Sequence, residues 1–394
     1  MENLLLTQDG VAIRLIDSDE KLLKAAEQLK KSKELGLDLE FDQNRFTYGF
    51  NLCLVQLADE NNNCYIIDPF LIKDLQPLFN LIEDPAITKI IHHSNNDILL
   101  LDKMGCSIKG VMDTDVAAKI LNYEKSSLAT VLKEEFNTEI DKSQQSSNWN
   151  KRPLTEDQLV YAAIDVIYLH RVKDKLVKEI TALGRENWLE EENQLLEKLR
   201  YTEPENPHLK LRNAFRLNYF QQFILKELYQ LRDTLARQFD KPSPYIIPND
   251  ALVELATEYN TNIHEWLNHT KGIHGGLKRP KNEQLLKDTI ANAIQAAKAQ
   301  HISNDYPISQ YQRPIRTAET ERRKEELTII QKQLIEEYGE FATRLIMNQN
   351  LIVDYSQTGK LKCYKKYGYN IITAKAKALG INLAVQTINS NDRK

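Results

Sequence analysis

The sequence predicts an α/β domain with a mixed β-sheet in its first half, followed by all-α helical bundles. Three observations lead to this prediction. Strand-like and helix-like segments alternate over the first 205 residues, which is typical of a sheet covered by helices. Beyond that point the apolar residues recur only with helical spacing. The length of 394 residues allows two or three domains, and the apolar content of 42% allows each a buried core.

The elements of the first half follow from local patterns. Four segments have the length and apolar pattern of strands, namely residues 34–41, 51–58, 61–70 and 88–94. Helical periodicity is found at residues 19–31, 96–104, 113–123 and 126–136. A last helix begins near Leu154, where Thr155 and Gln158 form a capping-box pattern, and it runs to about residue 176.

Two segments with little periodicity divide the chain. Residues 201–213 and residues 301–317 each contain two prolines and few regularly spaced apolar residues. We therefore expect three domains, at residues 1–205, 206–305 and 306–394.

The net charge of −4 hides an asymmetry between the two halves. Residues 1–205 contain 24 Lys and Arg against 37 Asp and Glu, whereas residues 206–394 contain 28 against 19. An acidic half joined to a basic half fits a protein that carries out chemistry in one place and holds a polyanion in another. The alternative is that the two halves simply have solvent-exposed surfaces of different composition, which would give the same numbers of charged residues.

The chain lacks the usual signs of secretion or membrane insertion. Its N-terminal residues have no basic segment followed by an apolar run, and no stretch approaches the roughly 18 apolar residues of a membrane span. The four cysteines are scattered and contain no CxxC pair, so we expect reduced thiols and not a disulfide framework or a zinc site. These features predict a cytoplasmic protein without a membrane partner.

Asp38 and Glu40 are the first candidate site residues. They are two apart on a predicted strand and therefore share one face, whereas Leu37 and Leu39 share the other. Acidic residues are poor strand formers, and two on one face repel each other unless a cation lies between them. A divalent metal is the simplest cation for this place, and an exposed polar face of an edge strand is the alternative.

Three more acids lie at or near the start of predicted helices. Asp97 follows the apolar segment 88–94, and taken alone it is best explained as an N-cap or first-turn residue. Asp113 and Asp115 begin the next helix, and helix capping is favoured for them as well.

Tyr161 and Asp165 are four residues apart, and so share one face of the last helix of the first half. Their apolar neighbours predict that this helix is largely buried, and a buried carboxylate needs a partner. A core tyrosine with a hydrogen-bonded hydroxyl is the alternative for Tyr161. Together, the four acids Asp38, Glu40, Asp97 and Asp165 provide the hard oxygen ligands that Mg²⁺ or Mn²⁺ prefers.

The order DxE, then Asp about sixty residues on, then YxxxD, resembles the DEDD superfamily of exonucleases over essentially all of residues 1–205. A tyrosine four residues before the last acid, with Val160 where another branch has histidine, is similar to the tyrosine branch. The segments DLEF, IIHHSNND, MDTDVAAKIL and SSNWNKRPLTEDQLVYAAIDVIYL resemble ribonuclease D.

This resemblance implies a ribonuclease-H-like fold and a two-metal 3′→5′ exonuclease. Asp38, Glu40, Asp97 and Asp165 are then expected to hold two divalent ions, Mg²⁺ or Mn²⁺, and Tyr161 to orient the attacking water. The expected products are nucleoside 5′-monophosphates. The expected substrate is RNA with a single-stranded 3′ end, transfer-RNA precursors among them, and we infer no obligate protein partner.

Further nucleic-acid contacts are expected from Trp149, Lys151 and Arg152, which precede the last helix of the first half. Residues 224–256 resemble the helicase-and-ribonuclease-D C-terminal (HRDC) domain, and Lys278 and Arg279 lie in a basic glycine-containing loop after it, suited to phosphate contacts. The last segment is weakly similar to a second such domain, and a plain helical cap would explain it too.

Two other functions remain open at the level of sequence. One is a DNA 3′→5′ exonuclease on the same fold, which would differ in its use of 2′-hydroxyl contacts. The other is a catalytically inactive RNA-binding protein, against which the intact set of acids argues.

Overall fold

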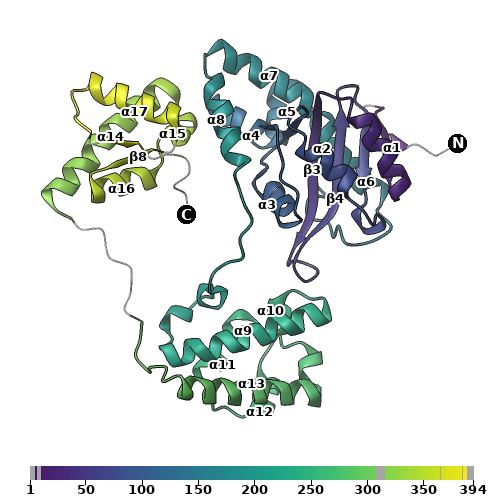
Figure 1. Ribbon diagram of the computed structural model, residues 1–394, viewed down its shortest axis with the longest axis vertical. Helices are drawn as coiled ribbons and strands as arrows, with labels where there is room; N and C mark the ends of the chain where they lie inside the picture. The colour runs from purple at the N-terminus through teal and green to yellow at the C-terminus, as the bar shows by residue number, and fades with distance from the viewer. Residues whose placement is uncertain (1–4, 7–9, 308–315, 364, 384, 388–394) are drawn as a thin grey trace.

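The computed structural model describes residues 5–6, 10–307, 316–363, 365–383 and 385–387 (Figure 1). It consists of an α/β domain, a helical bundle and a C-terminal helical module, in that order along the chain. Among the described residues, no helix is both long and apolar enough to cross a membrane. All four cysteines are buried and free, as the sequence predicts.

The first domain is built on a seven-stranded mixed sheet, in the order β1-β2-β5-β4-β3-β6-β7. Strands β3, β4 and β5 form an antiparallel meander, whereas β2–β5, β3–β6 and β6–β7 pair in parallel. The predicted mixed sheet is therefore confirmed. The strands are β1 Leu5–Leu6, β2 Ala12–Ile16, β3 Glu34–Gln43, β4 Phe50–Asp59, β5 Cys64–Ile67, β6 Thr88–Ile91 and β7 Val111–Asp113.

Helices cover both faces of this sheet, and each face has its own buried hydrophobic cluster. Helices α1 to α3 contribute to one cluster and α4 to α8 to the other. The helices are α1 Asp19–Leu29, α2 Gln76–Glu83, α3 Asn95–Lys103, α4 Thr114–Ile120, α5 Leu128–Phe136, α6 Glu156–Ile167, α7 Leu169–Ala182 and α8 Glu186–Leu196, with a short 3₁₀ helix at Pro69–Leu71.

The sequence prediction missed some elements and merged others. The expected single helix from Thr155 onward is two helices, because α6 ends at Ile167 and α7 begins at Leu169. Strands β1, β2 and β7 were not predicted, since segments of two to five residues are too short to show a period. Helix α2, with Pro77 in its first turn, was also missed.

The helical bundle follows the first linker. Its hydrophobic core is separate from those of the α/β domain, and the long helices α9 and α13 pack against each other within it. The helices are α9 Tyr219–Phe239, α10 Ser243–Ile246, α11 Asn249–Thr257, α12 Ile263–His269 and α13 Pro280–Ala299, with 3₁₀ helices at Pro207–Lys210, Ala214–Arg216 and Gly275–Lys278. In Figure 1 the β3–β4 hairpin points toward this bundle.

The C-terminal module lies against the α/β domain, next to α4 and α8. It contains α14 Ala318–Tyr338, α15 Glu340–Ile346, α16 Gln349–Thr358 and α17 Lys366–Ala378. It also contains a parallel pair of three-residue strands, β8 Leu361–Cys363 and β9 Val385–Thr387, which the expectation of helices alone did not include. Its likeness to a second HRDC domain, and the three domain boundaries, stay predictions.

Candidate active site

Strand β3 presents two carboxylates on one side of the sheet. Leu35, Leu37 and Leu39 are buried in the cluster on the opposite side, as the alternation predicts, so Asp38 and Glu40 face α6. The pairing of β3 with β4 shifts its register between Glu40 and Phe41. Such β-bulges bend a strand locally and are common next to active sites, where they redirect a side chain.

Helix α6 brings a third carboxylate to this strand because Gly36 allows a close approach. A Cβ atom on Gly36 would lie 2.8 Å from the carbonyl oxygen of Val166, so no larger residue fits without a shift of the helix. The N-terminus of α6 is fixed by the capping box of Thr155 and Gln158 that the sequence predicts. The backbone of α6 therefore rests on β3, with Asp165 beside Asp38.

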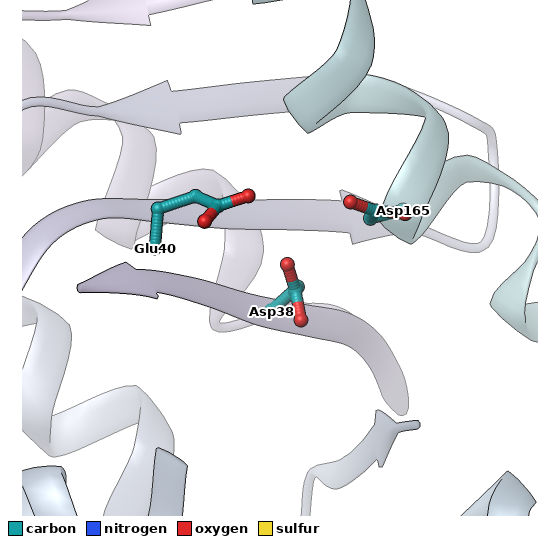
Figure 2. Close-up of side chains that lie close together, drawn as sticks. All are labelled: Asp38, Glu40 and Asp165. Carbon is teal, nitrogen blue, oxygen red and sulfur yellow. The ribbon is translucent and has the colours of Figure 1, made fainter. Parts of the chain in front are cut away.

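The carboxylates of Asp38, Glu40 and Asp165 converge, and each offers an oxygen within 4.8 Å of the others. Figure 2 shows the three side chains pointing into one common space from β3 and α6. Asp97, buried in the first turn of α3, lines the same cavity of about 540 Å³, as does Tyr161. The structure thus brings together the five residues that the sequence selects as catalytic.

Burial and mutual repulsion raise the pKa values of these acids. Burial comes first for Asp38, whose pKa lies well above its usual value, and the charges of Asp165, Asp97 and Glu40 raise it further. The pKa of Glu40 is raised by burial and then by Asp165 and Asp97. Burial also raises the pKa of Asp97 to about 8 and that of Asp165 to about 7. The four groups cannot all be ionised at neutral pH unless a cation offsets their repulsion.

Tyr161 is held by its neighbours in the cavity. Its hydroxyl hydrogen-bonds to Asp165, one turn further along α6, and its ring lies 6.1 Å from that of Trp149. Burial, and then the negative charge of Asp165, raise the pKa of Tyr161 above its usual value. The hydroxyl therefore stays protonated at neutral pH and is suited to orient a water molecule by hydrogen bonding, not to act as a strong base.

The donor set fits a hard divalent cation. Its ligand atoms are carboxylate oxygens, which Mg²⁺ and Mn²⁺ prefer, and neither of the soft ligands Cys and Met lines the cavity. A cation placed among Asp38, Glu40 and Asp165 would offset the repulsion that raises their pKa values. The residues present therefore fit a metal site.

Two of the predicted nucleic-acid contacts have structural partners. Trp149 is only 3% exposed and lies in the hydrophobic cluster. Arg152 pairs with Asp68, at 2.5 and 2.8 Å, and donates to the backbone carbonyl of Cys53. Packing and ion pairing account for these two side chains in the structure, and their contact with nucleic acid stays a prediction.

The other predicted contacts also stay predictions. Lys151 precedes α6 on the α/β domain, and Lys278 and Arg279 lie at the start of α13 on the helical bundle. All three side chains are exposed.

The cavity also contains residues that the sequence did not single out for function. Lys142 lies close enough to Asp165 to lower the pKa of that carboxyl. His93, Asp115 and Lys119 line the cavity as well. Asp115 and Lys119 are four residues apart on α4, and this spacing was the only sequence signal that could have indicated a functional pair. The same spacing is equally typical of a surface ion pair.

Comparison with known proteins agrees with this arrangement. Residues 13–181 match the family model of a 3′-5′ exonuclease domain, and residues 221–286 match the HRDC domain. The fold resembles that of ribonuclease D from Escherichia coli, with a TM-score of 0.69 at 22% identity over 93% of this chain and 99% of the other.

Two ribonucleases D are more similar in sequence. The protein from Desulfotalea psychrophila is 34% identical over 259 residues, which are 64% of this chain and 69% of the relative. The protein from Haemophilus influenzae is 30% identical over 333 residues, 83% of this chain and 80% of the relative. The chain therefore belongs to the ribonuclease D family of 3′→5′ exoribonucleases, whose exonuclease domain depends on divalent metal ions and is followed here by an HRDC domain.

Proposed function

We propose that this enzyme removes nucleotides one at a time from the 3′ end of RNA by hydrolysis at the cavity between β3, α3 and α6. The observation that carries the proposal is the convergence of three carboxylates within 4.8 Å, with the Tyr161 hydroxyl bonded to one of them. In this proposal Asp38, Glu40 and Asp165 hold one divalent ion, and Asp38 and Asp97 take part in holding a second.

Two Mg²⁺ or Mn²⁺ ions, when bound, would stabilise the charge on the attacking and leaving oxygens of the displaced phosphate. The residues of the chain orient the reactants. Tyr161 holds a water molecule in line with the scissile bond, and the water oxygen bonds to phosphorus as the bond to the 3′ oxygen breaks. The water gives up a proton, and the leaving 3′ oxygen gains one. The products are a nucleoside 5′-monophosphate and a strand shorter by one nucleotide.

We further propose structured RNA with a single-stranded 3′ tail as the substrate, transfer-RNA precursors in particular. The Escherichia coli relative is an exoribonuclease involved in structured RNA processing. Helical modules beside the exonuclease domain would hold the structured part of such an RNA while its tail enters the cavity.

The test is release of nucleotides from a 5′-labelled single-stranded RNA with Mn²⁺, beside a DNA strand of the same sequence. We expect stepwise shortening of the RNA by the wild type. Asp38→Ala should abolish it, and Tyr161→Phe should slow it about 100-fold, as expected for the loss of a group that positions the reacting water. Asp157→Asn, an exposed acid at the start of α6, is the matched control and should be as active as the wild type.

Two outcomes would overturn the proposal. Cleavage of the DNA strand at the same rate would show that the enzyme does not discriminate between RNA and DNA. RNA binding without any shortening, across metals and pH values, would leave an inactive RNA-binding protein.

A further inference from the structure

The cavity has four basic lining residues within the part of the chain described, Lys119, Lys142, His92 and His93. Lys119 and His93 form one wall of the cavity together with Asp115. Lys142 faces Asp165, and His92 bonds to Thr114 at 2.9 Å. Lys119 and His93 are joined instead by a carboxylate that belongs to none of the proposed metal ligands, Asp115.

Asp115 organises this wall. It is 5% exposed, its carboxylate accepts from the Lys119 ammonium at 2.5 Å, and its Oδ2 lies 3.2 Å from His93 Nδ1. A further hydrogen bond joins it to Ser126. The side chains of Lys119 and His93 nevertheless remain 37% and 63% exposed. An ammonium has three donors, so Lys119 can bond to Asp115 and still donate into the cavity.

The backbone around His93 is held in an uncommon conformation. His93 has φ of 63°, in the left-handed region that few residues other than glycine adopt. The carboxylate of Asp113 accepts from the backbone N–H of His93 at 3.1 Å and from that of Ser94 at 2.9 Å, which holds this turn in place. These hydrogen bonds fix the direction in which the His93 side chain leaves the backbone.

The order of the sheet sets the position of this wall relative to the reacting groups. Helix α6, with Tyr161 and Asp165, packs on β5, β4 and β3. The next strands are β6, which leads to Asp97, and β7, which leads to Asp115 and Lys119 on α4. Along the sheet, the carboxylates of β3 and Asp97 therefore lie between α6, which carries Tyr161, and α4, which carries Lys119.

The positions of Tyr161 and Lys119 indicate which part of the substrate lies beside Lys119 and His93. In an in-line displacement the leaving oxygen lies on the far side of phosphorus from the attacking water. If Tyr161 holds the water, the leaving 3′ oxygen and its nucleotide extend toward Lys119. The next group along that nucleotide with a full negative charge is its own 5′ phosphate.

We propose that Lys119 and His93, aligned by Asp115, bind the phosphodiester one position 5′ of the scissile bond. The inference rests on the proposed function and adds a substrate subsite to it. The subsite positions the nucleotide that carries the leaving 3′ oxygen. A dinucleotide that lacks the phosphate 5′ of this nucleotide is therefore expected to be a poor substrate.

The test uses two RNA strands of one sequence, which differ at the linkage one position 5′ of the scissile bond. One strand has a phosphodiester there and the other a neutral methylphosphonate. Only release of the first nucleotide is measured, as kcat/KM. For the wild type we expect the methylphosphonate to lower kcat/KM about tenfold, the loss expected for one hydrogen bond to a charged group.

Lys119→Met should lower kcat/KM about tenfold on the phosphodiester strand and not at all on the methylphosphonate strand. Lys119→Arg should restore most of the loss. His93→Asn should show the same substrate dependence in weaker form, and asparagine tolerates the left-handed backbone. Lys125→Met is the matched control, since Lys125 is exposed near the cavity but does not line it.

Equal losses for Lys119→Met on both strands would overturn the subsite and leave the Asp115–Lys119 pair a purely structural one. A wild type that shortens neither strand would instead overturn the proposed function, so the two failures are distinguishable.

Discussion

The two helical modules are attached to the exonuclease domain in different ways. The C-terminal module shares a hydrophobic cluster with it, and the ring of Tyr367 stacks on that of Trp188 at 5.0 Å. Side chains of the exonuclease domain also cap helices of the module. Asn122 accepts from the backbone N–H of Phe341 at the start of α15, and Glu191 accepts from those at the start of α17.

The HRDC bundle has its own core and meets the exonuclease domain at the tip of the β3–β4 hairpin. There the Tyr48 hydroxyl donates to Asp233 at 2.8 and 2.9 Å and accepts from Arg237 at 3.2 Å. The backbone N–H of Tyr48 donates to Asp240 at 3.2 Å.

The two kinds of contact distinguish a module that is packed into the fold of the exonuclease domain from one that is attached to it at a small interface. Burial of apolar surface is the main stabilising contribution in folding, whereas exposed polar pairs contribute little. The C-terminal module should therefore unfold together with the exonuclease domain. The contact of the HRDC bundle consists of polar pairs and of the single Tyr48 ring packed on its core. An interface as small as this leaves relative domain motion as the default expectation, so the HRDC bundle should be able to move. The hairpin at this interface is continuous with the strand that holds Asp38 and Glu40.

The largest effect is expected at the shared core. Tyr367 is 2% exposed, and Tyr367→Ala should lower the free energy of unfolding by about 3–5 kcal/mol, the usual cost of deleting a large buried aromatic side chain. Urea denaturation followed by tryptophan fluorescence would measure it. Val353→Ala, 45% exposed in the same module, should change the free energy by less than about 0.5 kcal/mol. A loss for Tyr367→Ala no greater than for Val353→Ala would mean that the module is not part of the enzyme's fold.

A smaller effect is expected where Asn122 caps α15. Asn122 has φ of 68°, so Asn122→Gly keeps the backbone conformation and removes the capping oxygen. We expect a loss of about 1 kcal/mol in the free energy of unfolding, the usual value of one hydrogen bond. Asn62→Gly is the control, because Asn62 has φ of 65° and an exposed side chain. If the two variants lose equal stability, the cap contributes nothing.

The smallest effect on stability is expected at the HRDC contact. Tyr48→Ala should change the free energy of unfolding by less than about 1 kcal/mol, because both the polar contacts of Tyr48 and the packing of its ring on the bundle are partly exposed. It should nevertheless increase the radius of gyration of the chain measured by small-angle X-ray scattering, since the bundle loses its attachment point. Tyr245→Ala, 60% exposed on the bundle, should leave the scattering unchanged. An unchanged radius of gyration for Tyr48→Ala would show that other contacts fix the bundle.

The sequence predicted the strands and helices that hold the site because their patterns are local. The alternation around Asp38 and Glu40 and the capping box before α6 each lie within a few residues. The contact that joins them depends on the space beside Gly36, which only the folded chain defines. The docking of the C-terminal module is likewise non-local, since Asn122 and Phe341 are 219 residues apart.

The catalytic residues could be predicted from the sequence because their chemistry needs a rare combination of residue types. The residues that surround them could not. Four acids and a tyrosine in a fixed order have few structural explanations. The sequence did not show that Trp149 packs in the hydrophobic cluster and that Arg152 pairs with Asp68, because an aromatic and a basic residue before a helix fit packing and RNA contact equally well. Asp115 and Lys119 were not selected because an acid and a lysine four apart on a helix usually form a surface pair.

The central claim is that the four clustered carboxylates hold divalent ions, and calorimetric titration with Mn²⁺ tests it most directly. We expect saturable binding to the wild type, with two ions per chain when adenosine 5′-monophosphate is present. Asp38→Asn should abolish this binding, and the exposed control Asp157→Asn should retain it. Absence of saturable binding to the wild type, or equal binding to Asp38→Asn, would contradict the account.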